Sequence, residues 1–193
     1  MTKPCTERAF SGRWAVLAAM LAAAVLPGAV VASETLVREL EQRLSAQGVD
    51  EVNAYLGTQG SANLVTLHRS TTGCDLHAVS LSIQLGRGSS SKTVDAHREA
   101  LRVAVGSCTA FVLALLSPNE VPKVCASAAS WTVTQMAREL RRRIKSLDAD
   151  ETLSASPRGK ACRAAYLYEL QNTRVGLRIG PSGTSRPSGN PHP

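Results

Sequence analysis

Residues 94–116 read VDAHREALRVAVGSCTAFVLALL, and large apolar side chains recur along them at intervals of three and four. This spacing places the side chains on one face of an α-helix. The sequence therefore predicts one long helix over 94–116 and a helical fold around it. The stripe consists of Leu101, Val105, Cys108, Val112 and Leu115.

The sequence downstream predicts further helices. Ser117-Pro118-Asn119-Glu120 is a turn sequence, and Pro122 fits a helix only within its first turn. Apolar residues with the helical period then continue from Val133 to Leu147, and another helix is expected over roughly 160–172.

The sequence upstream is also mainly helical. A helix that contains Leu36 to Leu44 is expected to end at Gly48, and a short one is expected over 50–56. In the next segment, which starts after Gly60, His68 is expected to face solvent. The stretch 76–85 fits both a helix and a half-buried strand, because its apolar residues also alternate. We favour the helix; the alternative is a short β-ribbon with 175–179.

The first 32 residues have the order of a secretory signal peptide. Basic residues precede the apolar run 14–26, which is followed by Pro27-Gly28 and by small residues up to Ala32. We expect cleavage after Ala32. The alternative is an uncleaved membrane anchor, because 14–32 approaches the roughly 20 residues that span a bilayer. Pro27-Gly28 favours cleavage, since it shortens the uninterrupted helix.

Three segments follow from this interpretation. Residues 1–32 are the signal peptide, 33–179 form a helical disulfide-bonded domain, and 180–193 form a flexible tail rich in Pro, Gly and Ser. The many alanines and arginines suggest a bacterial genome of high GC content, so the periplasm is the expected compartment. A secreted protein and a membrane-anchored protein are the alternatives.

Four cysteines remain after removal of the signal peptide, and in an oxidising compartment they predict two disulfides. They are Cys74, Cys108, Cys125 and Cys162. If the turn at 117–120 joins two antiparallel helices, Cys108 and Cys125 lie at similar heights. We therefore expect Cys108–Cys125 and Cys74–Cys162. The rival pairing, Cys74–Cys108 with Cys125–Cys162, holds if 76–85 is helical and forms a hairpin centred near Ser90.

The chain is basic, with a formal net charge of +7, and its cations gather on the helix expected over 133–148. A solvated helix face explains such a cluster in most proteins. The cluster is also the best candidate for a binding face. It comprises Arg138, Arg141, Arg142, Arg143 and Lys145.

Motifs for catalysis or cofactor binding are weak. Gly86 to Thr93 resembles a nucleotide-binding P-loop, but Ser91 stands in place of the second glycine. His68, Cys74, Asp75 and His77 could approach a metal, but a disulfide would consume the thiol. We therefore expect no cofactor, no metal and no catalytic residues.

The sequence predicts a mainly α fold, a small disulfide-linked helical bundle. We expect a non-enzymatic exported protein that binds another macromolecule, such as an immunity protein or an accessory factor for secretion or host association, including symbiosis. The expected partner is another envelope or secreted protein. An anionic envelope polymer or membrane surface is the alternative, and nucleic acid is not expected. A small hydrolase of envelope polymers and a structural envelope protein are the competing functions.

Overall fold

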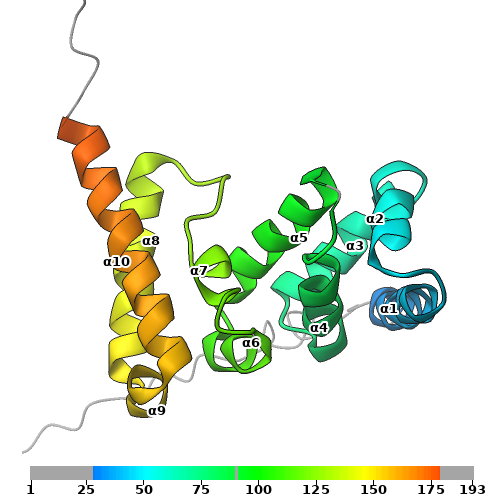
Figure 1. The fold of residues 1–193 in the computed structure, drawn as a ribbon, viewed down its shortest axis with the longest axis horizontal. Coiled ribbons are helices and arrows are strands. Elements are labelled where there is room, and N and C mark those ends of the chain that lie inside the picture. Colours follow the sequence, from blue (N-terminus) through cyan, green and yellow to red (C-terminus); the bar gives the residue numbers. More distant parts are fainter. Residues whose placement is uncertain (1–27, 90, 179–193) are drawn as a thin grey trace, which may run out of the picture.

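Ten helices and no strand make up the part of the chain that the structure describes. The structure is a computed structural model, which describes residues 28–89 and 91–178. The helices succeed one another along the long axis in approximately chain order, from α1 at one end to the α8, α9 and α10 group at the other (Figure 1). Their bounds are α1 Gly28–Gln47, α2 Val49–Thr58, α3 Ser61–Thr72, α4 Leu76–Leu85, α5 Ser91–Ala104, α6 Thr109–Leu115, α7 Val121–Val124, α8 Val133–Ala149, α9 Glu151–Ala155 and α10 Pro157–Arg178.

The mainly helical prediction is therefore confirmed for the described residues. The expected helices near 36–44, 50–56, 133–148 and 160–172 correspond to α1, α2, α8 and α10. The ambiguous stretch 76–85 is helical and forms α4. Within the described ranges, no helix combines the length and the apolarity needed to cross a membrane.

The core has two sections that meet at α4. Leu81 and Leu85 of α4 pack with apolar residues of α1, α2 and α3, whereas Val79 and Ile83 pack with residues of α5 to α10. A ten-residue helix can serve both sections because Leu, Val and Ile occupy most of its circumference. Most buried apolar residues are Leu, Val and Ala, and Tyr166 is the largest fully buried side chain.

The α3–α4 corner sets the position of one cysteine. The backbone N–H of Asp75 donates to the carbonyl of Ser70, and that of Cys74 donates to Thr71, which is the Schellman pattern. This pattern needs left-handed backbone at Cys74, whose φ is +67°. Glycine normally takes this position, but here Gly73 lies one residue earlier. The Asp75 carboxylate then caps α4 by accepting the N–H of Ala78.

The prediction of one helix over 94–116 is wrong, because the chain turns between α5 and α6. The N–H of Gly106 donates to the carbonyl of Val103 rather than to that of Arg102, so the α-helical pattern ends there. A new helix begins after Cys108. Glycine costs about 1 kcal/mol in a helix interior, so Gly106 makes this break inexpensive.

The expected cysteine pairing is also wrong, and the rival pairing is present. Cys74 bonds to Cys108 and Cys125 bonds to Cys162. The expected pairing needed a continuous helix before the turn at 117–120, but Cys108 lies at the break and faces the start of α4. The α4–α5 hairpin brings Cys74 opposite Cys108, while Cys125 at the end of α7 faces α10. Two such disulfides are typical of proteins that mature in an oxidising compartment.

The boundaries of the expected segments are only partly covered. Residues 1–27 and 179–193 lie outside the described residues, so most of the signal peptide and the whole tail stay predictions. Helix α1 begins at Gly28, before the expected cleavage site after Ala32. The contact between the hydroxyls of Ser33 and Ser70 joins the start of the expected mature chain to α3.

Candidate functional site

The predicted basic face lies on α8, at one end of the molecule and beside α10 (Figure 1). A capping box starts this helix: the hydroxyl of Thr132 accepts the N–H of Gln135, and the amide oxygen of Gln135 accepts the N–H of Thr132. Leu140 and Leu147 bury one side of α8. The helical period therefore turns Arg138, Arg141 and Lys145 toward solvent.

Arg143 departs from the expected face, because only 5% of its surface is exposed. Its Nε donates to Glu139 at 3.1 Å, and its Nη1 donates to the carbonyl of Arg102 at 2.6 Å and to the hydroxyl of Tyr166 at 3.3 Å. Its guanidinium also lies over the Trp131 ring, with 4.7 Å from Cζ to the ring centroid. Arg143 is thus a structural residue that joins α8, α10 and the end of α5.

The break after α5 makes this arrangement possible. The carbonyl of Arg102 has lost its helical donor, since the N–H of Gly106 bonds elsewhere, and Arg143 supplies the replacement. A cation at a helix C-terminus is also favoured by the helix dipole. Gly106 leaves room for the guanidinium, because a Cβ there would lie 2.5 Å from Nη2 of Arg143.

Arg142 is exposed but engaged within the protein. It makes a two-pronged contact with Glu139, with Nε to Oε2 at 2.8 Å and Nη2 to Oε1 at 2.6 Å, and it donates to the carbonyl of Gly106. Glu139 therefore serves two arginines. The bonds from Arg142, followed by those from Arg143, lower the pKa of Glu139 to about 2 despite its partial burial.

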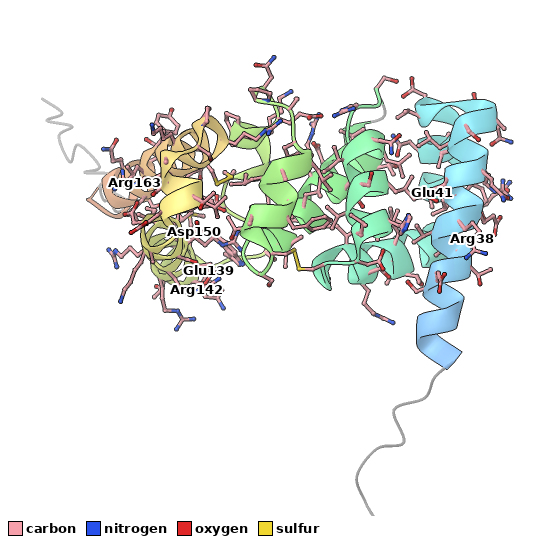
Figure 2. All side chains as sticks on the ribbon, turned by 90° about the horizontal axis from the view of Figure 1, so that it is seen from below. Arg38, Glu41, Glu139, Arg142, Asp150 and Arg163 are labelled. Atoms are coloured by element: carbon pink, nitrogen blue, oxygen red, sulfur yellow. A yellow bond between two sulfur atoms is a disulfide. The ribbon has the colours of Figure 1, made fainter. Side chains whose placement is uncertain are left out.

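The other three cations of the predicted basic face are not used in polar contacts within the described part of the protein. Arg138, Arg141 and Lys145 are exposed and make no hydrogen bond or ion pair with another described residue. Arg163 on the neighbouring α10 differs, since it pairs with Asp148 at 2.6 Å. Figure 2 shows Arg163 apart from Glu139 and Arg142, which lie close together. The predicted five-residue face is thereby reduced to three residues with unpaired charge.

A hollow of about 260 Å³ is lined by one of these three cations, Arg138. Trp131 and side chains of α8 form one side, and the end of α5 with the segment that follows it forms the other. Arg138, which has no partner among the described residues, and Arg142 both line it. We call it the α8 hollow; its lining residues are Val103, Gly106, Ser107, Trp131, Gln135, Arg138, Glu139, Arg142 and Arg143.

The other sequence candidates take different roles. Cys74 is in a disulfide, His77 contacts Glu41 at 3.3 Å, and His68 pairs with His97. His68 is partly buried by this pairing, so the expectation that it faces solvent is wrong. Within the described residues, no three His, Cys, Asp or Glu side chains come together as a metal site.

The segment that resembles a P-loop also lacks the expected surroundings. It follows a helix, α4, rather than a strand, and the carboxylate of Asp50 accepts the N–H of Ser89 at 2.7 Å. Trp131 and Gly106 also line the α8 hollow, and no sequence pattern marks either of them as part of a site. The Trp131 ring and the buried Arg143 come together only because α8 and the α5–α6 break are neighbours in space.

Comparisons with family models, with curated proteins and with solved structures each found no match to the chain.

Proposed function

We propose that this is a non-enzymatic exported binding protein, and that it holds an acidic side chain of a partner protein in the α8 hollow. The observation that carries the proposal is Arg138, which is exposed, lines the hollow and has no carboxylate partner among the described residues. A carboxylate from outside would supply that partner. Charge-assisted hydrogen bonds of this kind are about twice as strong as neutral ones.

The wall of the hollow is held in place before any partner arrives. Arg143 connects Trp131, Glu139 and Tyr166, and its Nε and Nη1 donate to Glu139, to the carbonyl of Arg102 and to the hydroxyl of Tyr166. Tyr166 is fully buried, and this burial raises the pKa of its hydroxyl. A rigid wall reduces the conformational entropy lost on binding. Trp131 and Arg143 thus form a prearranged wall of the hollow that Arg138 also lines.

The composition of the hollow favours a protein partner over a polyanionic polymer. Tryptophan and arginine are the residues that most often dominate the affinity of protein interfaces. Long anionic polymers require many unpaired cations along a surface, whereas α8 offers three, Arg138, Arg141 and Lys145, and of these only Arg138 lines the hollow. Nearby Arg142 and Arg163 already bind carboxylates of this chain.

Matched charge reversals test the proposal. Tagged full-length protein is produced in its source cells, cross-linked, recovered from the envelope and compared with two variants. One variant carries Arg138→Glu and Arg141→Glu, and the control carries Arg158→Glu and Lys160→Glu, exposed cations on α10. Both variants change the net charge of the protein by the same amount. A difference in binding between them therefore reflects the position of the charges and not general electrostatic attraction.

We expect wild type and control to retain one partner in a constant ratio. The variant at 138 and 141 should bind the purified partner at least tenfold more weakly, because two cations become repulsive. If both variants lose binding equally, or if the retained material is a polymer released by salt, the proposal is wrong. The second result would favour the structural envelope protein.

A further inference from the structure

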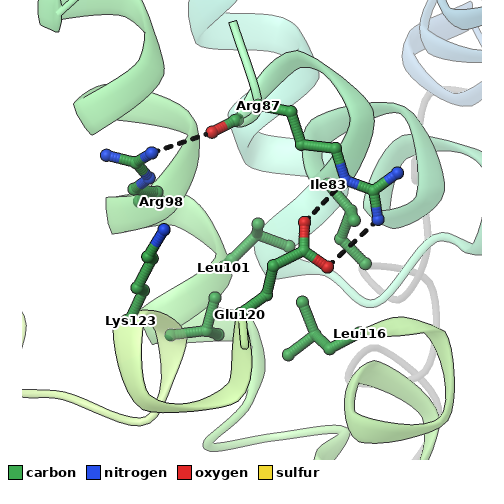
Figure 3. Close-up of a pocket in the computed structure, with 9 residues that line it drawn as sticks. Ile83, Arg87, Arg98, Leu101, Leu116, Glu120 and Lys123 are labelled. Carbon is green, nitrogen blue, oxygen red and sulfur yellow. Dashed lines mark hydrogen bonds and ion pairs between the residues drawn. The ribbon is translucent and has the colours of Figure 1, made fainter. Parts of the chain in front are cut away.

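A second cavity, which shares no lining residue with the α8 hollow, combines an apolar floor with a cationic rim. It lies between the end of α4, α5 and the α6–α7 segment, and we call it the α5–α7 pocket (Figure 3). Its volume is about 190 Å³. Ile83, Leu101, Leu116 and Val124 form the floor, and each is at most 5% exposed. The floor is therefore the surface of the core itself.

The charged residues of the rim are not balanced within the pocket. Glu120 is neutralised by Arg87, which donates from Nε at 2.6 Å and from Nη2 at 3.0 Å. Arg98 donates to the carbonyl of Gly86 and contacts the exposed Asp95 at 3.3 Å. The side-chain ammonium of Lys123 has no partner among the described residues. Among the lining residues, three cations thus face a single carboxylate, and only Arg87 is paired with it.

The orientation of Lys123 adds to this imbalance. Figure 3 shows its side chain pointing toward Arg98 at the edge of the pocket. Two like charges that face each other repel, and an anion between them relieves the repulsion. Asp95 offsets part of the charge of Arg98 from outside the pocket, so a monoanion such as a carboxylate matches the remaining charge better than a doubly charged phosphate does.

We propose that the α5–α7 pocket binds a carboxylate that carries a short aliphatic chain. The carboxylate lies between Lys123 and Arg98, and the chain covers Leu101 and Val124. Sites that enclose whole drug-sized ligands measure about 300 to 1,000 Å³, so a cavity of about 190 Å³ suits a group of a few carbon atoms. Two sources supply this group: a free short-chain carboxylate, or the C-terminus of a peptide that ends in an aliphatic residue.

Calorimetric titration of the full exported protein tests the proposal with three matched probes. Hexanoate has both the charge and the chain, acetate has only the charge, and hexylamine has the chain with the opposite charge. We expect saturable binding of hexanoate and at least tenfold weaker binding of the other two. Equal binding of all three, or no binding of hexanoate, overturns the proposal.

Two variants at the rim should change the affinity in opposite directions. Lys123→Gln removes the unpaired cation and should weaken hexanoate binding about tenfold, as expected for a charge-assisted hydrogen bond. Glu120→Gln leaves Arg87 without its carboxylate and should strengthen binding severalfold. Lys160→Gln, on α10 outside the pocket, is the control and should change nothing. Thermal unfolding verifies that Lys123→Gln, an exposed position, still folds; an unchanged affinity in that folded variant would refute the site.

A tripeptide that ends in leucine, as the free acid and as the amide, identifies the source of the carboxylate. If the acid binds at least tenfold more tightly than hexanoate and the amide does not bind, the pocket recognises a peptide C-terminus. If hexanoate binds as tightly as the acid, the pocket recognises a free carboxylate. Equal binding of acid and amide contradicts the proposal.

Discussion

Arg143 occupies its position because Gly106 has no Cβ atom. A Cβ at Gly106 would lie 2.5 Å from Nη2, 2.7 Å from Cζ and 3.0 Å from Nε of Arg143. The whole guanidinium, and not only its tip, would have to move. It would then lose its bonds to the carbonyl of Arg102 and the hydroxyl of Tyr166 and its position over Trp131. One missing methyl group thus supports the wall of the α8 hollow.

Gly106→Ala should therefore destabilise the protein by about 2 kcal/mol, the loss expected when a buried charged group gives up hydrogen bonds. Urea unfolding measures this change. In an Arg143→Met background the obstacle is gone, and the same substitution should be neutral or slightly stabilising, because alanine restricts the unfolded chain more than glycine does. Equal costs in both backgrounds would show that the two residues are not coupled.

His97 is another residue whose surroundings have a measurable consequence. It is fully buried, its Nδ1 lies 3.1 Å from Nε2 of His68, and its own Nε2 has no hydrogen-bond partner among the described residues. Burial, assisted by the nearby His68, lowers the pKa of His97 to about 3. Burial also lowers the pKa of His68. Both rings are therefore neutral in the folded protein at neutral pH.

The pKa of His97 is lower in the folded protein than in the unfolded chain, and this makes the protein less stable at acidic pH. Below pH 6.5 an unfolded histidine binds a proton, while folded His97 does not until about pH 3, so stability falls as the pH falls from 6.5. The loss is about 1.4 kcal/mol per pH unit for one such group. His97→Gln should reduce the slope by this amount between pH 6 and 5.

Between pH 6 and pH 5, the carboxylates whose pKa is lowered contribute little to the change in stability. Glu120 and Glu139, each with a pKa of about 2, lose their stabilising effect only as the pH falls below their ordinary value of 4.5. Urea unfolding at pH 5, 5.5 and 6 measures the two slopes. Parallel slopes for wild type and His97→Gln would contradict the assignment to His97.

At the scale of the helices, periodicity predicts the elements but not their ends or breaks. Leu101, Val105 and Val112 of the predicted stripe are buried, but Leu115 is exposed. The helical period did not reveal the break after α5. Gly106 was the only local signal of the break. A single glycine in a helical pattern is common, so its role becomes visible only once Arg143 lies against it.

The cysteine pairing depended on the same break. Spacing alone allowed both pairings, and the choice between them required knowing whether 94–116 was continuous and whether 76–85 was helical. The second point was ambiguous because α4 packs against two core sections, so its apolar residues satisfy both a period of two and a period of 3.6. A helix that is buried on two sides has no clear division into an apolar and a polar face, and predictions from periodicity depend on that division.

The candidate site was predictable only in part for a related reason. The sequence located the cations of α8, and the structure leaves Arg138, Arg141 and Lys145 exposed as a helix face should. The inward turn of Arg143 was not predictable, since its acceptors belong to Arg102 and Tyr166, far away in the sequence. A charged residue is buried only where the fold supplies such partners.

At the scale of the whole molecule, the two disulfides hold different parts together. Cys74–Cys108 joins the α3–α4 corner to the start of α6 and so links the two core sections across α4. Cys125–Cys162 lies entirely within the section formed by α5 to α10, and both of its cysteines are fully buried. Cys74 and Cys108 are only partly buried.

Replacing each cysteine pair by alanines compares the two bonds. The sequence separations are 34 and 37 residues, so each bond should stabilise the protein by about 4 kcal/mol through its effect on the unfolded chain. Any difference in stability between the two variants then comes from the surroundings of each disulfide in the folded protein. Removing the sulfurs of Cys125 and Cys162 leaves a cavity in the core, at a further cost of about 1 to 2 kcal/mol. We therefore expect the variant without Cys125–Cys162 to have the lower free energy of unfolding in urea, and a reversed order would show that the link between the two core sections contributes more than the packing within one.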